Sequence, residues 1–150
     1  MKTEEKSSIK VSRRFDAPAE RVFDAWLDPA VARKWLFVTD DGAITRCDLD
    51  ARPGGKWTIT RRGPSPEPPN DVIDMEHTGE YLEIERPRRL VFTFGVPKFS
   101  AEKTTVAIGI APVQKGSELT LTNDGVPEEW AERTEQGWRM ILDQLAKVLE

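Results

Sequence analysis

His77 is the residue with the clearest potential for chemistry, because it is the single histidine among the 150 residues of this chain. The ordinary pKa of histidine lies near neutrality, which suits general acid–base catalysis when a neighbouring group positions the ring. Asp48, Asp74 and Glu76 are candidate neighbours. Nothing in the sequence joins one of them to His77, and histidine is commonly of intermediate burial. We therefore favour a packed histidine in the wall of a pocket over a catalytic base.

Cys47 is the single cysteine, so it cannot form an internal disulfide bond. One cysteine and one histidine also cannot supply the four ligands of a structural zinc site. A nucleophilic thiol needs a lowered pKa, and Arg46 is expected to point to the opposite face of the strand. A core position is more typical of an unpaired cysteine. The sequence therefore predicts no catalytic residue, no metal and no cofactor.

Large apolar side chains are the stronger signal for a binding site. Aromatic residues make up 8% of the chain, and most of them are needed for the core. Some lie on segments that are expected to face one another around a cavity. The candidate ligand-binding residues are Trp35, Phe37, Trp57, Met75, His77, Phe92, Phe94, Thr134, Trp138 and Ile141. Gly137, in an expected helix, is attributed to close packing against a strand rather than to room for a ligand.

The charge balance argues against nucleic acid and membranes as partners. The chain has 22 basic and 26 acidic residues, which gives no broad field of one sign. Its charged first residues, and the lack of a run of about 18 apolar residues, predict a cytoplasmic protein without a membrane span. Arg61 and Arg62 are interpreted as solvated surface. A homodimer through exposed sheet or helix surface is a further expectation.

Hydrophobic periodicity predicts one domain over residues 1–150, with residues 1–7 as a flexible N-terminus. Alternating apolar and polar residues mark the strands, and apolar residues three and four apart mark the helices. The strands are expected at residues 8–15, 43–49, 55–62, 72–84, 89–95, 104–111 and 117–123, and the helices at residues 18–27, 28–36 and 127–150. The strand over 72–84 is expected to switch faces at Gly79.

This order of elements predicts a container. A twisted sheet of seven strands tends to curl, and its concave face needs a cover. The C-terminal helix is the element long enough to provide it. Space near the mouth that side chains do not fill becomes a cavity. The proline-rich loop over residues 63–71 is interpreted either as a lid over the mouth or as a plain mobile loop.

Five blocks of residues carry a family resemblance over essentially the whole chain. The blocks are residues 15–23, Trp35, residues 50–57, residues 79–84 with Pro87 and 89–92, and Gly137-Trp138 with Leu142 and Leu145. In this order they resemble the SRPBCC superfamily, and more narrowly the domain of the activator of heat shock protein 90 ATPase (AHSA1-like).

The resemblance implies an α+β, START-like helix-grip fold. That fold is a curved seven-stranded antiparallel sheet with two short helices and one long C-terminal helix, which together enclose a hydrophobic cavity. Similar domains often carry a histidine where this chain has Asn123, which argues against histidine chemistry at that position.

Three functions are compatible with this resemblance. The preferred one is a binding domain for a hydrophobic small molecule, without demonstrated catalysis. The first alternative is a co-chaperone-like module whose partner is the chaperone heat shock protein 90, as the family's name suggests. The second alternative is a cyclase- or hydrolase-like enzyme that uses His77 with a carboxylate on a ligand in the cavity.

Overall fold

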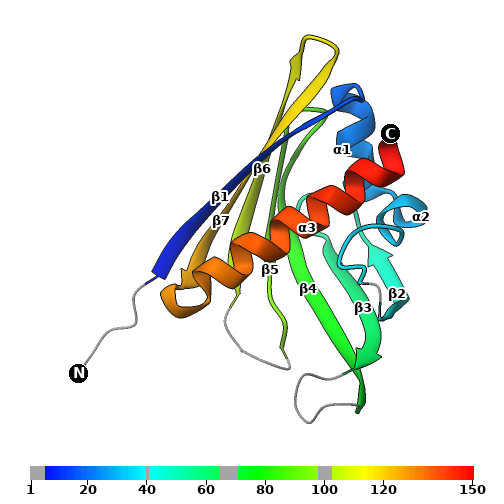
Figure 1. The fold of residues 1–150 in the computed structure, drawn as a ribbon, viewed down its shortest axis with the longest axis vertical. Helices are drawn as coiled ribbons and strands as arrows, with labels where there is room; N and C mark the ends of the chain where they lie inside the picture. Colours follow the sequence, from blue (N-terminus) through cyan, green and yellow to red (C-terminus); the bar gives the residue numbers. More distant parts are fainter. Residues whose placement is uncertain (1–5, 40, 65–70, 98–102) are drawn as a thin grey trace.

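An antiparallel sheet wraps around the helices of this chain (Figure 1). The computed structural model describes residues 6–39, 41–64, 71–97 and 103–150. The strands are β1 (Lys6–Phe15), β2 (Ala43–Leu49), β3 (Lys56–Pro64), β4 (Val72–Glu85), β5 (Arg89–Phe94), β6 (Thr104–Val113) and β7 (Gly116–Pro127). The helices are α1 (Ala19–Leu27), α2 (Pro29–Ala32), the short 3-10 helix η1 (Glu128–Trp130) and α3 (Ala131–Leu149).

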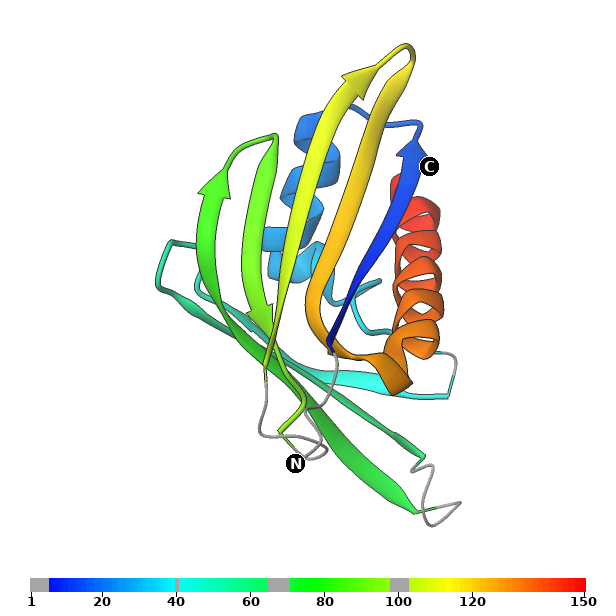
Figure 2. The same cartoon turned by 90° about the vertical axis from the view of Figure 1, so that its left-hand side faces the viewer.

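The predicted fold class is confirmed: α+β, with a curved seven-stranded antiparallel sheet and a long C-terminal helix. The strand order is β1-β7-β6-β5-β4-β3-β2, so β1 and β2 are the two edges. Figure 2 shows the sheet curling around α1, α2 and α3. Within the described residues, no helix is long and apolar enough to cross a membrane.

The first and last strands run further than expected, because they extend each other. β1 begins at Lys6, before residue 8, and β7 continues past residue 123 to Pro127. Lys6 pairs with Pro127 and Ser7 with Val126, after a bulge that shifts the register. Residues 1–5 lie outside the described residues. Residues 6 and 7, expected in a flexible N-terminus, are part of the strand instead.

The second short helix, α2, has a single turn and ends well before residue 36. Asp28 caps it, since its side chain accepts a hydrogen bond from the amide of Ala30 at 3.0 Å. The amides of Lys34 and Trp35 then bond to carbonyls three residues back, at 2.9 and 3.1 Å, so the chain tightens into turns. The last helix also starts later than residue 127, because η1 comes first.

β4 presents one face to the interior along most of its length. Met75, His77, Gly79 and Tyr81 lie on that face and alternate with more exposed residues. The alternation changes only after Tyr81, where the pairing with β5 shifts register. The predicted switch at Gly79 is therefore wrong. The glycine instead permits close approach of β5, since a Cβ at this position would lie 1.7 Å from the carbonyl oxygen of Thr93.

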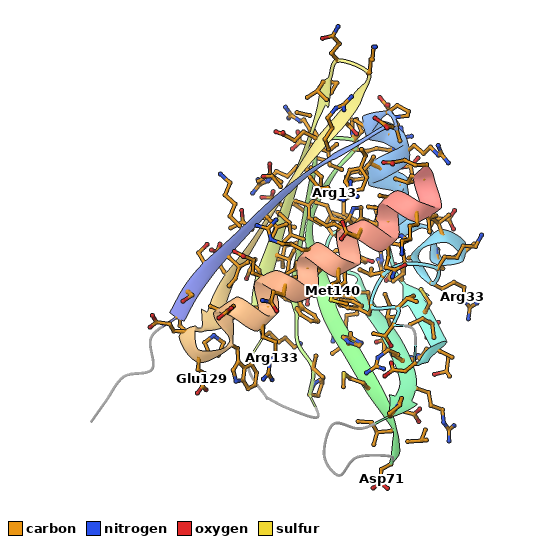
Figure 3. All side chains as sticks on the ribbon, in the orientation of Figure 1. Arg13, Arg33, Asp71, Glu129, Arg133 and Met140 are labelled. Atoms are coloured by element: carbon orange, nitrogen blue, oxygen red, sulfur yellow. The ribbon has the colours of Figure 1, made fainter. Side chains whose placement is uncertain are left out.

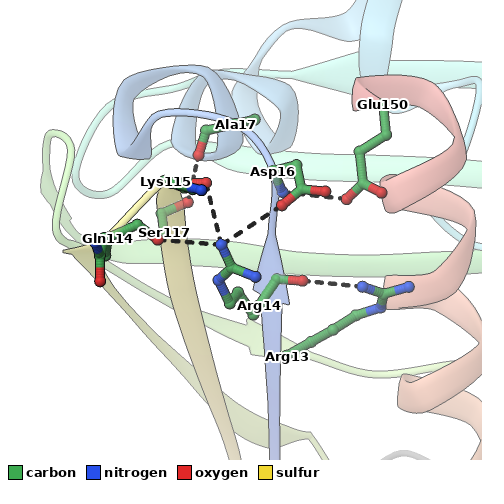
Figure 4. A network of polar contacts seen from close by, with 8 residues as sticks. All are labelled: Arg13, Arg14, Asp16, Ala17, Gln114, Lys115, Ser117 and Glu150. Atoms are coloured by element: carbon green, nitrogen blue, oxygen red, sulfur yellow. Dashed lines mark hydrogen bonds and ion pairs between the residues drawn. The ribbon is translucent and has the colours of Figure 1, made fainter.

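The second half of α3 closes one end of the core. Its leucines share a buried cluster with aromatic residues of β1 and α1, including Leu142, Leu145, Leu149, Phe15, Phe23 and Trp26. Polar contacts fasten this end (Figure 4). The amide of Asp16 donates to Oε2 of Glu150 at 3.2 Å, and Oγ of Ser117 donates to the carbonyl of Ala17 at 2.8 Å. The C-terminal end of α3 and the start of β7 are thereby tied to the turn after β1.

Candidate functional site

A cleft of about 570 Å³ lies beside the first half of α3. Its walls come from one face of α3, from β3 and β4, from the end of β5, and from residues 37–39 after α2. Figure 3 shows the side chains of this region, with Arg133 near the start of α3 and Met140 further along the helix. The volume falls within the range of about 300–1,000 Å³ that is typical of small-molecule sites.

One face of α3 forms the first wall. Arg133, Gly137, Ile141 and Gln144 line the cleft and lie three or four residues apart, so they share a helix face. A side chain on Gly137 would meet open space, since no described atom beyond its chain neighbours and the backbone of its own helix lies within 4 Å of the position of its Cβ. The interpretation of Gly137 as a close-packing residue is therefore wrong. The glycine leaves an opening in the wall, although it lowers helix stability by about 1 kcal/mol relative to alanine.

Stacked aromatic rings form the facing wall. The ring of Phe37 lies 4.1 Å from that of His77, with an interplanar angle of 7°, and 5.3 Å from the ring of Phe94. The ring of Trp138, which comes from α3, contacts this stack at 6.0 Å from Phe37 and is tilted by 54°. Phe37 has a φ of 62°, in the left-handed region that bulky residues rarely adopt. Such a conformation persists when the surrounding packing imposes it, so the turn after α2 holds this ring in place.

His77 is neutral at physiological pH. It is 7% exposed, and burial lowers its pKa to about 4, with the positive charge of Arg61 acting in the same direction. Its Nδ1 lies 3.1 Å from the carbonyl oxygen of Ile59. Because a carbonyl only accepts, Nδ1 carries the proton and donates it. Within the described residues, this partner is a backbone carbonyl and not a carboxylate. The arrangement fits a wall residue better than a general base, whose pKa is best near the working pH.

Arg61 is a cleft residue that the sequence interpretation missed. Its side chain is 12% exposed, so the expectation of a solvated surface residue is wrong for Arg61 and correct for Arg62, whose side chain is 62% exposed. Nη1 donates to Oγ1 of Thr39 at 3.1 Å. The signal was present in the alternation of β3, which places Arg61 on the same face as Trp57 and Ile59.

A buried hydrogen-bond network fixes Trp138 in the wall. Its indole Nε1 donates to Oδ1 of Asn123 at 3.0 Å. The amide Nδ2 of Asn123 donates in turn to Oγ1 of Thr104 at 2.9 Å and to the carbonyl of Thr105 at 3.2 Å. Asn123 is 1% exposed, and a buried amide with both ends bonded rigidifies its surroundings. Asn123 therefore orients Trp138 in the wall of the cleft.

A smaller hollow of about 220 Å³ adjoins the cleft. The two share Phe94, Val96 and Thr134 as lining residues. Trp130 lines the smaller hollow and is 42% exposed. The apolar surface therefore continues around the start of α3.

Seven of the ten candidate ligand-binding residues line the cleft: Phe37, Met75, His77, Phe94, Thr134, Trp138 and Ile141. The structure places Trp35, Trp57 and Phe92 in the packed core, where they are at most 4% exposed. The indole of Trp35 donates to the carbonyl of Ala25 at 3.1 Å, and Trp57 packs edge-on against Phe92 at 5.6 Å. These three residues do not line the cleft.

Cys47 is half-buried on β2, away from the cleft lining. Its Sγ lies 3.8 Å from the carbonyl oxygen of Pro29. Burial raises the pKa of the thiol, which disfavours the thiolate that a nucleophile needs. The proposed lid over residues 63–71 falls mostly on residues 65–70, which lie outside the described residues.

Comparison with known proteins adds a family and a set of similar folds. The sequence model of the family described as activator of Hsp90 ATPase homolog 1-like protein matches residues 16–150. A crystal structure from Chromobacterium violaceum is similar with a TM-score of 0.82 and 28% identity, covering 95% of this chain and 96% of that one. No curated protein sequence matches the chain.

Two further structures share the fold at lower identity. The solution structure of an AHSA1-like protein from Aeromonas hydrophila gives a TM-score of 0.76 at 22% identity, covering 95% of this chain and 91% of that one. A protein of unknown function from Staphylococcus aureus gives 0.80 at 14% identity, covering 97% and 94%. Similarity at these identities concerns the fold alone.

Proposed function

Because the chain belongs to the family of activator of Hsp90 ATPase homolog 1-like proteins, we propose that it binds a hydrophobic small molecule in the cleft beside α3. The observation that carries this proposal is the open space at Gly137, in a cleft that the stacked rings of Phe37 and Phe94 also line. Side chains fill the neighbouring aromatic region around Trp26 and Trp57, where about 10 Å³ remains. An unfilled apolar space beside a filled one supports a ligand site rather than loose packing.

Native mass spectrometry tests for a ligand that is already bound. The mass of the freshly purified protein is compared with its denatured mass, and anything released is identified. We expect a reproducible extra mass of small-molecule size. If the protein shows no extra mass, the titration described next decides whether the cleft accepts a ligand.

The neutral fluorophore N-phenyl-1-naphthylamine serves as the probe of the empty cleft. Gly137→Leu places a side chain into the opening and should weaken binding of the probe by about tenfold. Gln136→Leu adds the same side chain on the exposed face of α3 and should leave binding unchanged. Equal affinities for the wild type and both variants, or no saturable binding at all, would refute the proposed function.

Interaction with the chaperone heat shock protein 90 is a second proposal, which depends on the name of the family alone. A pull-down with the chaperone and a measurement of its ATPase rate test this idea. Absence of binding together with an unchanged rate would refute it.

A homodimer and a cytoplasmic location stay predictions from the sequence. Cyclase- or hydrolase-like catalysis through His77 has the least support, because its pKa lies near 4 and Nδ1 is bonded to Ile59.

A further inference from the structure

The charged side chains that line the cleft are basic, although the net charge of the chain is −4. They are Arg61 from β3 and Arg133 from α3, and none of the described lining residues is acidic. His77 contributes no charge at neutral pH, since burial keeps its pKa near 4. Positive charge above an apolar wall favours an anion over a cation in this site.

The guanidinium of Arg61 has few strong acceptors among the described residues. It carries five N–H donors, of which one bonds to Thr39 at 3.1 Å. A second nitrogen lies 3.8 Å from Sδ of Met75, a weak acceptor. The carboxylate of Asp41 lies 3.7 Å away, beyond ordinary hydrogen-bond distance, and its side chain is 66% exposed. Among the described residues, Arg61 is therefore largely desolvated and has an ion pair with the exposed Asp41 but no hydrogen-bonded anion. A bound oxyanion would stabilise this guanidinium.

The two arginines stand on different walls of the cleft and differ in exposure. Arg61 is half-buried on β3, whereas Arg133 is exposed on α3. Arg133 is the weaker contributor to affinity, because water and salt screen an exposed charge. The planar fork of Arg61 matches the two oxygens of a carboxylate or sulfonate. An apolar body beside that head group would contact Phe37, Phe94 and Trp138, which line the same cleft.

We propose that the ligand of this cleft is an anionic amphiphile, with an aromatic or acyl body and an oxyanion that Arg61 holds. This inference rests on the proposed function and narrows its ligand class. It assigns Arg61 a binding role that charge alone does not give to the neighbouring Arg62, whose side chain points to solvent and lies 3.9 Å from Asp74.

A matched pair of fluorophores tests the inference. 8-Anilinonaphthalene-1-sulfonate and N-phenyl-1-naphthylamine share one aromatic body, and only the first carries a sulfonate. Each is titrated into the wild type and into the Arg61→Met, Arg61→Lys and Arg62→Met variants. Circular dichroism and thermal unfolding confirm that each variant is folded, and the titrations are repeated at low and high salt.

We expect Arg61→Met to weaken the sulfonate probe by about tenfold and to leave the neutral probe nearly unchanged. Arg61→Lys should restore part of the loss, since it keeps the charge without the planar fork. Arg62→Met should change neither probe. Salt should weaken the sulfonate probe more than the neutral one in the wild type.

Two results would overturn the inference, and a third would overturn the proposed function as well. If Arg61→Met weakens both probes equally, Arg61 only shapes the wall. If it weakens neither, or if Arg62→Met has the same effect, the oxyanion is not held by Arg61. If the wild type binds neither probe, the cleft is not a ligand site and both proposals fail together.

Discussion

The two halves of α3 have different surroundings. In the second half, Leu142, Leu145 and Leu149 are at most 5% exposed and belong to the closed core. In the first half, Met140 is 65% exposed and Gly137 faces open space. The same helix is therefore a core element at one end and a cleft wall at the other.

The difference comes from what lies opposite the helix. The second half packs near β1 and α1, and polar contacts fasten its end (Figure 4). The first half faces β3 and β4 across the cleft. Stability and ligand binding should therefore respond to different substitutions along one helix, which makes the comparison testable.

Leu145→Ala should give the largest effect, on the core half. Removing this buried side chain, 0% exposed, should lower the free energy of unfolding by about 2–5 kcal/mol. Chemical denaturation measures the change, with Met140→Ala in the exposed half as the control, expected within about 0.5 kcal/mol. Equal losses for both variants would contradict the division of α3 into two halves.

Acidification should lower the free energy of unfolding through His77, a cleft residue on β4. The pKa of His77 is about 4 in the folded protein and about 6.5 in an unfolded chain. Between these values the unfolded state binds more protons, so the stabilisation is complete above pH 6.5 and is lost as pH falls toward 4. The loss of stability from His77 should total about 3 kcal/mol.

Denaturation at several pH values compares the wild type with His77→Asn. Asparagine keeps a donor for the carbonyl of Ile59 but does not titrate, so the variant should show a shallower fall in stability between pH 6.5 and 4. Identical pH profiles for both proteins would show that His77 is not the group responsible.

Asn123→Ala tests the hydrogen bond that holds Trp138 in the first half of α3. Removing the amide leaves the indole N–H of Trp138 buried without its 3.0 Å acceptor, which should cost about 1–3 kcal/mol. Thermal unfolding measures this cost, and Trp138→Phe is the companion variant because it removes the donor. The double variant should lose less than the sum of the two single losses. Strict additivity would mean that the bond does not couple the two residues.

Gly137→Ala should give the smallest change, and in the opposite direction. Alanine fits the open space at this position and should raise the free energy of unfolding by about 1 kcal/mol through its helix propensity. Binding of N-phenyl-1-naphthylamine should weaken slightly, since a methyl group narrows the cleft. Unfolding and titration of one preparation give both values; a loss of stability would mean that the space around Gly137 is already filled.

The sequence predicted the elements of the fold better than their ends. Among the described residues, the sequence pattern identified every strand and α-helix but included the short η1 in the last helix, because burial on one face leaves a repeating pattern. The predicted ends of strands were wrong where pairing with a neighbouring strand determines them. Lys6 of β1 and Pro127 of β7 pair with each other and so extend both strands. The predicted end of α2 was wrong because the chain continues as 3-10 turns, which depend on tertiary packing and not on the spacing of apolar residues.

The cleft was harder to predict than the fold, because periodicity gives the face of a strand but not what covers it. Trp57 and Arg61 share the inner face of β3, yet Trp57 lies in the core and Arg61 lines the cleft. Gly137 was interpreted as a packing residue because a glycine inside a helix often marks close approach of another backbone, but the position faces open space. The way α3 crosses the sheet decides which part of the sheet stays uncovered, and the sequence pattern does not contain this information.

The two edge strands carry a consequence for self-association. β1 and β2 lie at opposite edges of the sheet, and each contains an irregular register, near Ser7 and near Ile44. β2 also exposes the charged pair of Arg46 and Asp48. Bulges and charges on an edge discourage backbone pairing with another chain. Two copies of this protein should therefore not join their edges into one continuous sheet, and any dimer must form through side-chain surfaces instead.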